Sequence, residues 1–332
     1  MIYGWVFLCS FCLTVFLSPL IIRISYKLDI LSNPKKGEGK GKPCLGGVGI
    51  YAAFIIAALS AYFLKLPYTA GFVGFIVSSS LIFLVGLVDD IKDLRPYQKI
   101  VPQLIAIGCL IAFGIFTKIS FLPVWLNVLI TVLWVLYITN AFNLLDIVDG
   151  LTSGLVIIIS ATLLVISLMD KDIFSSIILI ALIGSHAGFL KYNYPPAKLY
   201  MGDTGSLFSG FLLAAVAINI SYAPLERPVA LMTPVLVMSL PIYDTIFLII
   251  MRSKKRKSIF KKTNDHFALR LVTMGYSVRK SIWIMYLFSI FLAISSLIVA
   301  FGPNIIGLIV LMIILAVFVC MGKKVGMVKI DD

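Results

Sequence analysis

Long apolar runs limit what this chain can fold into more than any other feature of its sequence. Each run is close to the ~20 residues that an α-helix needs to cross a bilayer. The eleven predicted spans are residues 3–22, 46–64, 69–88, 101–116, 122–139, 153–169, 173–190, 207–223, 229–251, 282–300 and 304–321. Hydrophobic residues make up 61% of the chain, against ~45–50% in soluble domains. We therefore predict an all-α polytopic membrane protein that forms one domain over residues 1–332.

The distribution of Lys and Arg predicts how these spans are oriented. With the N-terminus outside, all but four of the 28 basic residues fall on the inner side, and the exceptions are Lys65, Lys118, Lys171 and Arg227. Basic residues concentrate on the cytoplasmic side of membrane proteins. The formal charge of +13 therefore reports topology rather than nucleic-acid binding, and we predict a cytoplasmic C-terminus.

An acidic segment follows the fifth run. It holds Asn140, Asn143, Asp146 and Asp149, although ionisable groups at membrane depth are costly and usually functional. On a helical turn, carboxylates three residues apart point to one side, which suits a divalent cation. The alternative is a polar loop that leaves the bilayer and caps the next helix.

Two other inner segments carry carboxylates. Asp89, Asp90 and Asp93 follow the third run with Lys99 shortly after, and Asp203 stands just before the eighth run, following Gly202. Three carboxylates in five positions repel one another unless a cation lies among them, and a solvated acidic turn is the alternative. The neighbouring glycine would let Asp203 reach a metal with little obstruction. Lys99 could hold a phosphate as a point charge.

The remaining candidates are glycines, an aromatic residue and single polar groups. Gly46 and Gly47 open a helix after a basic loop, which suits a phosphate. Tyr200 could stack on a base or anchor the chain at the membrane interface. Asp244, inside the ninth run, needs a partner or marks a kink, and His186 is predicted to hydrogen-bond between helices.

Carboxylates, basic groups and glycine loops at one membrane face favour metal-dependent phosphoryl transfer from a soluble nucleotide to a lipid phosphate. The non-enzyme alternative is a transporter with Asp244 and His186 as a proton relay, but five polar loops on one face argue against alternating access. A CDP-alcohol phosphatidyltransferase is disfavoured, since its signature continues with Ala-Arg where this chain has Leu-Thr-Ser-Gly after Gly150.

The same motifs carry a resemblance. In chain order they are Asp89-Asp90-x-x-Asp93 with Lys99, Asn140-Ala-Phe-Asn143 followed by Asp146-x-x-Asp149-Gly150, Asn193-x-x-Pro196-Ala197, Met201-Gly202-Asp203-Thr204-Gly205 and Pro241-Ile-x-Asp244-Thr245. From Leu28 to about Ser277 the chain resembles the polyprenyl-phosphate N-acetylhexosamine-1-phosphate transferases of glycosyltransferase family 4. The resemblance implies transfer of a sugar 1-phosphate from a UDP-sugar to undecaprenyl phosphate in the plasma (inner) membrane, with release of UMP. It also implies Mg²⁺, or Mn²⁺ in its place, and a role in starting cell-wall or surface glycan assembly.

By position, the resemblance implies roles for several of these residues. Asp89 and Asp90 look catalytic, and Asp149 and Asp203 look like metal-site residues. The expected substrate-binding residues are Lys99 for phosphate, Asn193 and Tyr200 for uridine, and Asp93, Asn140, Asn143, Asp146, Gly46, Gly47, His266 and Arg270. Eleven spans resemble the branch that uses UDP-GlcNAc, and the alternative is a phospho-N-acetylmuramoyl-pentapeptide transferase. The oligomeric state is open, with a homodimer as one option.

Two points stay open at this stage. The segment from Asp265 to Arg270 keeps only one His of the family's histidine cluster, so the sugar is not determined. For the mechanism, we favour Asp89 or Asp90 deprotonating the lipid phosphate, which attacks the β-phosphorus in line. An aspartyl-phosphate double displacement is the competing hypothesis. Either needs carboxylates that are distant in the sequence to converge beside the inner leaflet.

Overall fold

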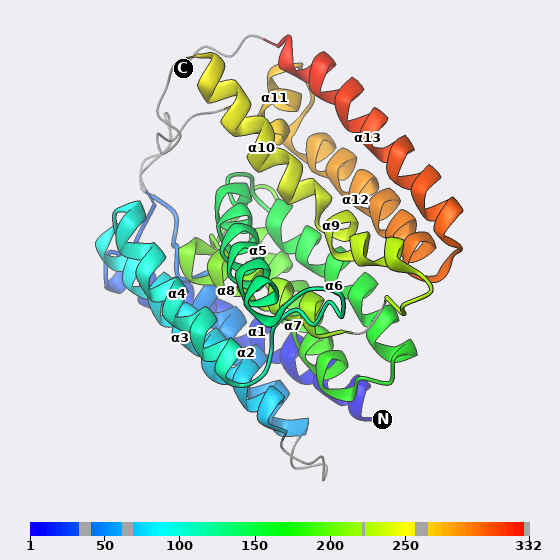
Figure 1. The fold of residues 1–332 in the computed structure, drawn as a ribbon. Helices are drawn as coiled ribbons and strands as arrows, with labels where there is room; N and C mark the ends of the chain where they lie inside the picture. The colour runs from blue at the N-terminus through cyan, green and yellow to red at the C-terminus, as the bar shows by residue number, and fades with distance from the viewer. Residues whose placement is uncertain (33–40, 62–68, 221–222, 256–264, 329–332) are drawn as a thin grey trace. The chain divides into compact units, whose positions relative to one another are not determined.

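The computed structural model describes residues 1–32, 41–61, 69–220, 223–255 and 265–328, and in these ranges the regular structure is helical apart from one bridge between Leu31 and Pro43. The chain divides into two compact units, Met1–Ile220 and Ser221–Asp332, and Figure 1 follows it in colour from blue to red. The prediction of a single domain is not tested by this division and stays a prediction.

The first unit contains the three acidic segments described above, which all precede the ninth predicted span. Its helices are α1 (Ile2–Lys27), α2 (Gly46–Ser60), α3 (Ala70–Lys92), α4 (Pro96–Ala112), α5 (Val124–Leu145), α6 (Leu151–Met169), α7 (Ile173–Asn193) and α8 (Gly202–Asn219). Helix α8 is central, because it packs against α2, α3 and α5 and every residue from Thr204 to Ala217 is buried. A helix that is buried all round has protein on every side. Its N-terminus therefore places Asp203 among several neighbouring helices.

Small residues let α1 and α7 approach closely. A Cβ atom added at Gly184 would lie 2.1 Å from Ser10 Oγ and 2.6 Å from the Phe7 carbonyl oxygen, and one added at Gly188 would lie 2.6 Å from the Phe11 carbonyl oxygen. Glycines four residues apart allow such backbone contact between membrane helices. These two glycines let α1 pack against α7, the helix that ends at Asn193.

We expect Gly184→Leu to destabilise the protein strongly, because the side chain has no space against the α1 backbone. The midpoint of thermal unfolding in detergent should fall by several degrees, in line with ~1–3 kcal/mol or more for overpacking. Gly108→Leu is the matched control, because Gly108 is exposed and a Cβ atom there meets nothing within 4 Å. An unchanged midpoint for Gly184→Leu would contradict the observed packing.

The second unit contains η2 (Pro228–Met232), α9 (Thr233–Val237), α10 (Ser239–Lys254), α11 (Phe267–Thr273), α12 (Val278–Phe301) and α13 (Asn304–Gly326). The pair formed by η2 and α9 meets α10 at an angle of 69°. The bend precedes Asp244 by less than two turns, so the predicted ninth span is broken rather than straight. Helix α13 is mostly exposed, with 11% of its most apolar window buried.

Seven described helices are long and apolar enough to cross a membrane, and the bent pair would make an eighth. Each of the eleven predicted spans overlaps a described helix, but α2, α4 and α8 do not meet the requirement of length and hydropathy. The predicted count of eleven is therefore not confirmed.

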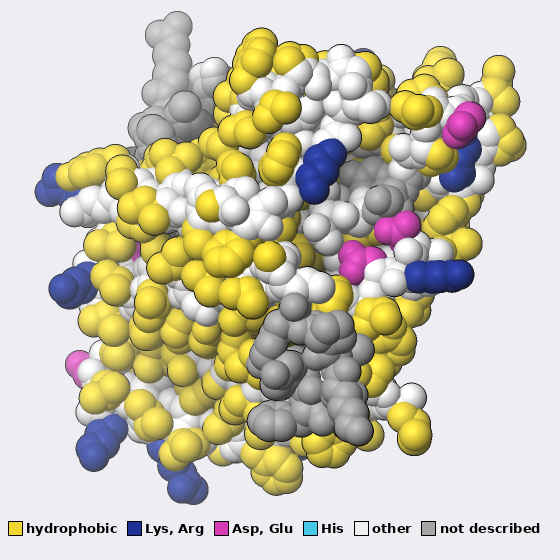
Figure 2. All heavy atoms as spheres, turned by 60° about the horizontal axis from the view of Figure 1, so that its bottom comes forward, with side chains coloured by type: hydrophobic (Ala, Val, Ile, Leu, Met, Phe, Trp, Pro, Cys, Tyr) yellow, Lys and Arg dark blue, Asp and Glu magenta, His cyan; other side chains and the backbone are white. Residues whose placement is uncertain are grey.

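Figure 2 shows hydrophobic side chains over most of one face, and large apolar residues such as Phe16, Leu133 and Met312 are more than half exposed. Such surfaces suit contact with lipid, as expected for a multi-pass membrane protein.

Candidate active site

The last turn of α3 carries Asp89 and Asp90. Asp93 ends the helix in the left-handed conformation, with φ 49°, and the turn that follows is held by a 2.8 Å hydrogen bond from the Leu94 amide to Asp89 Oδ1. Neighbouring residues on a helix point about 100° apart. The two carboxylates therefore reach different partners although they are adjacent in the sequence.

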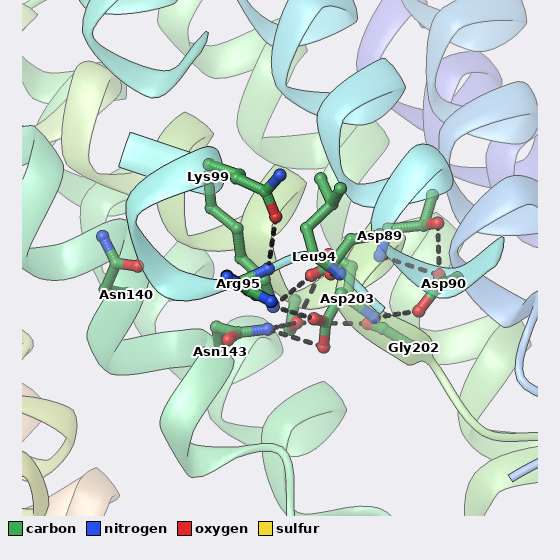
Figure 3. Close-up of polar contacts among 12 residues, drawn as sticks. Asp89, Asp90, Leu94, Arg95, Lys99, Asn140, Asn143, Gly202 and Asp203 are labelled. Carbon is green, nitrogen blue, oxygen red and sulfur yellow. Dashed lines mark hydrogen bonds and ion pairs between the residues drawn. The ribbon is translucent and has the colours of Figure 1, made fainter. Parts of the chain in front are cut away.

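Lys99 lies between the carboxylates of Asp89 and Asp203 (Figure 3). Its Nζ atom is 2.7 Å from Asp203 Oδ2 and also contacts Asp89 Oδ2. The Asp89 side chain is 1% exposed, whereas that of Asp203 is 35% exposed. A buried carboxylate is costly without a partner, and Lys99 supplies the positive charge that stabilises Asp89. The higher exposure of Asp203 means that solvent can reach the cluster from the side of Asp203.

One amide of α5 contacts this cluster, and a second amide of the same helix pairs with α4. Asn143 Nδ2 donates to Asp203 Oδ1 at 2.9 Å and to Ser206 Oγ at 3.0 Å. One turn earlier, Asn140 Nδ2 donates to Gln103 Oε1 at 2.8 Å. Asp203 is thus held by a lysine from α4 and an amide from α5. Both were predicted as site residues, and the structure brings them to the same carboxylate.

Asp90 contacts the start of α8. Its carboxylate accepts hydrogen bonds from the backbone amides of Asp203 and Thr204 and from the Thr204 hydroxyl. Gly202 precedes these residues with φ +73°, a conformation that favours glycine. Asp89 and Asp90 therefore both reach the Asp203 region, one through a lysine and the other through the backbone.

Gly46 and Gly47 bind the segment that leads into α8. Their amides donate to the carbonyl oxygens of Tyr200 and Met201 at 2.9 and 2.8 Å. A Cβ atom at Gly47 would lie 2.2 Å from the Gly205 nitrogen, so close contact between α2 and α8 requires glycine there. The two glycines have a structural task beside the predicted contact with substrate, and that contact stays a prediction.

The loop after α7 is tied to the turn after α5. Gly150 N donates to Asn193 Oδ1 at 2.9 Å, and the Ala197 amide donates to Asp149 Oδ2 at 2.9 Å. Residues 146–150 form a non-helical turn, so the expectation that Asp146 and Asp149 share a helical turn is wrong. The left-handed Gly150, with φ +78°, starts α6 directly after it. Asn193 thus fixes the acidic turn, and its predicted contact with uridine stays a prediction.

The charges of this region favour a cation. Burial raises the pKa of Asp146 to about 7, and the negative charges of Asp203, Asp90 and Asp149 act in the same direction. Within the described residues, no three His, Cys, Asp or Glu side chains are grouped closely enough to hold a metal ion. The donors are nevertheless carboxylate oxygens, which Mg²⁺ prefers. Their chemistry fits a hard cation that one or two carboxylates and a substrate phosphate hold together.

The second unit contains His266 and Arg270, and each has a buried protein partner. His266 Nδ1 lies 2.8 Å from Asp244 Oδ2, so Asp244 has a partner, as predicted, although the sequence did not identify which residue it is. Arg270 pairs with Asp265 at 2.8 Å and donates to the carbonyl oxygens of Val325 and Val328. Arg270 is only 1% exposed, so it holds the end of α13 in this unit. Contact of either residue with substrate stays a prediction.

The sequence assigned no role to three polar residues of the site: Gln103, Ser206 and Thr204, although Thr204 belongs to one of the motifs. All three lie in or beside apolar runs, where single polar residues usually hydrogen-bond between helices. That signal applied equally to His186, whose predicted role is confirmed by the 2.9 Å distance between its Nε2 atom and Ser209 Oγ on α8. The partner of each residue could not be found from its position in the sequence alone.

Comparison with known proteins identifies relatives of this chain. The model of glycosyl transferase family 4 matches residues 72–221, which include Asp89, Lys99, Asn143 and Asp203. The chain is 29% identical to a probable undecaprenyl-phosphate N-acetylglucosaminyl 1-phosphate transferase of Bacillus subtilis, over 97% of this chain and 92% of that protein. It is 31% identical to a phospho-N-acetylmuramoyl-pentapeptide-transferase of Lactobacillus gasseri, over 82% and 90%. A decaprenyl-phosphate N-acetylglucosaminephosphotransferase of Mycobacterium leprae is 27% identical over 83% and 78%.

Proposed function

The chain belongs to glycosyl transferase family 4, and from this membership we propose that it transfers an N-acetylhexosamine 1-phosphate from a UDP-sugar to undecaprenyl phosphate, releasing UMP. The Bacillus subtilis relative, whose name includes undecaprenyl phosphate and N-acetylglucosamine, aligns over 97% of this chain. The muramoyl-pentapeptide transferase of Lactobacillus gasseri aligns over 82%. The broader coverage favours N-acetylglucosamine, and the pentapeptide substrate is the second candidate.

The observation that carries the proposal is the position of Lys99. An ammonium group between Asp89 and the more exposed Asp203 is a charge that an incoming diphosphate can attract, because phosphate binds lysine as a point charge. Drawn toward the substrate, Lys99 would leave Asp89 Oδ2 able to accept a proton. The site thus combines a lysine that can bind phosphate with a carboxylate that can accept a proton once the lysine has moved.

We propose direct in-line transfer. Asp89 accepts the proton of the lipid phosphate, and a lipid phosphate oxygen forms a bond to the β-phosphorus of the UDP-sugar. The bond from that phosphorus to the bridging oxygen breaks, and UMP leaves with the bond electrons. Asp149 and Asp203 would hold Mg²⁺, which when bound neutralises the diphosphate and stabilises the leaving UMP.

We also propose the orientation in the membrane. Placing the N-terminus outside puts the Asp89 and Asp203 ends of α3 and α8 on the cytoplasmic side, together with most basic residues. A soluble UDP-sugar would reach the site from the cytoplasm, and the lipid phosphate would reach it from the inner leaflet of the plasma membrane. This location agrees with the start of cell-wall or surface glycan assembly.

The experiment uses the purified full chain in detergent with Mg²⁺, undecaprenyl phosphate and one of three donors: UDP-GlcNAc, UDP-GalNAc or UDP-MurNAc-pentapeptide. We expect UMP release and a lipid product whose mass corresponds to one added N-acetylhexosamine phosphate. Product from the pentapeptide donor alone would select the second candidate. Absence of UMP release from all three donors, together with solute uptake by vesicles containing the protein, would overturn the enzymatic function.

A further inference from the structure

We infer that Asp90 is a positioning residue, which caps helix α8 and so fixes Asp203, and that it does not exchange protons with the lipid phosphate. The inference rests on the proposed function, and it gives the adjacent Asp89 and Asp90 different tasks. Four features of the structure distinguish these tasks: the missing local cap of α8, the contacts of Asp90, the space at Gly202, and the partners of Asp89.

Helix α8 has no cap from its own sequence. Met201 stands at its N-cap position, and no side-chain hydrogen bond is made there. The first amides of a helix lack partners within the helix, and Ser, Thr, Asp or Asn usually supplies them at this position. A buried helix start without such a residue needs an acceptor from another element.

Asp90 supplies that acceptor from α3. Its Oδ1 atom accepts from the Asp203 amide at 2.7 Å, and Oδ2 accepts from the Thr204 amide at 3.0 Å and from the Thr204 hydroxyl. A carboxylate is also favoured at a helix N-terminus by the helix dipole. Both oxygens of Asp90 therefore serve the first turn of α8, across 113 residues of sequence.

Glycine at position 202 makes this contact possible. A Cβ atom there would lie 2.3 Å from the Cys44 carbonyl oxygen and 2.6 Å from Asp90 Oδ2. Only a residue without a side chain lets the carboxylate approach so closely. The backbone of the Met201–Thr204 segment is thus shaped to receive Asp90.

Asp89 differs from Asp90 in the partners of its oxygens. One oxygen accepts from the Leu94 amide at 2.8 Å, and the other contacts the Lys99 side chain. A side chain such as lysine can move toward a substrate, whereas helix amides cannot leave without unwinding the turn. Asp89 therefore has an oxygen that the reaction can use, and those of Asp90 are committed to the fold around Asp203.

The variants Asp90→Asn and Asp90→Ala separate the two roles. Asn keeps an acceptor for the Asp203 amide, and the Thr204 hydroxyl can rotate to accept from the new NH₂ group, so only the Thr204 amide loses its acceptor. Under the positioning role we expect Asp90→Asn to stay within about tenfold of the wild-type kcat. We expect Asp90→Ala to lose about 100-fold, because a misplacement of ~1 Å at a reacting group costs that much. A lost general base would cost both variants ~10²–10⁴-fold.

Hydrogen–deuterium exchange of the peptide covering residues 201–207 gives a readout that does not need activity. We expect the fastest exchange in Asp90→Ala, a smaller increase in Asp90→Asn, which keeps the contact with the Asp203 amide, and wild-type-like exchange in the matched variant Asp89→Asn. Turnover should fall by about 100-fold or more in Asp89→Asn although the peptide stays protected. Adding Thr204→Val to Asp90→Ala should cause no further loss, because residues that act through one contact are not additive.

Two results would overturn the inference. The first is an Asp90→Asn enzyme as inactive as Asp90→Ala with the peptide still protected, which would place the carboxylate in the chemistry. The second is unchanged hydrogen–deuterium exchange in Asp90→Ala, which would show that Asp90 does not cap α8. If the wild-type protein makes no lipid product with any donor, the proposed function fails, and the exchange measurement still decides whether Asp90 caps α8.

Discussion

Asp203→Asn should lower turnover by about 10³-fold, the upper range for loss of one preorganised charged group in an active site. Asn keeps the shape of the side chain and an oxygen that can accept from Asn143, which lies 2.9 Å from Asp203 Oδ1. It removes the charge that faces Lys99 at 2.7 Å and that would hold the cation. UMP release measures the loss, and electron paramagnetic resonance of added Mn²⁺ measures cation binding, which we expect to weaken in parallel.

The matched control for this variant is Asp172→Asn. Asp172 caps α7 through a 3.1 Å hydrogen bond from the Ser175 amide, and Asn is an equally good cap. We expect its turnover and Mn²⁺ binding to match the wild-type protein. Near-normal activity of Asp203→Asn would remove Asp203 from the proposed cation site, whereas lost turnover with normal Mn²⁺ binding would assign it a role in the chemistry alone.

Lys99→Met should reduce both stability and turnover. The Asp89 side chain, 1% exposed, would lose its counter-charge, and leaving one buried charge unpaired costs about 3–5 kcal/mol. We expect a lower unfolding midpoint in detergent and a loss of about 10²–10³-fold in turnover. Lys118→Met, at an exposed position in the segment between α4 and α5, is the control and should behave like the wild-type protein.

The double variant Asp89→Asn with Lys99→Met separates the two effects. It removes both charges of the pair, and replacing both partners is far less costly than breaking the pair. We expect the unfolding midpoint to recover toward that of the wild-type protein, while turnover stays low because the phosphate-binding charge and the proton acceptor are both absent. Recovery of turnover would show that the pair serves the fold alone, and would contradict the proposed roles of Lys99 in phosphate binding and of Asp89 in proton transfer.

Several elements were predictable because their signals are local. The helices follow from apolar runs of bilayer length, and the described helices overlap every predicted run. Carboxylates beside such runs indicate function, because burial makes them costly, and Asp89, Asn143 and Asp203 do come together. The turn at residues 146–150 was not predictable from spacing, because the hydrogen bonds that define it come from Asn193 and Ala197.

The sequence by itself therefore determined that this chain is a helical membrane protein of a phosphotransferase family. It also indicated several polar residues, among them Asp89, Lys99 and Asp203, that the structure brings together. Only the tertiary structure decided what each residue contacts. Asp90 caps a helix 113 residues away, and Lys99 pairs with a carboxylate 104 residues away. Hydrophobicity and motif spacing are properties of neighbouring residues, but the partner of a buried charge depends on how α3, α4 and α8 pack together. That packing is what gives two adjacent aspartates different tasks.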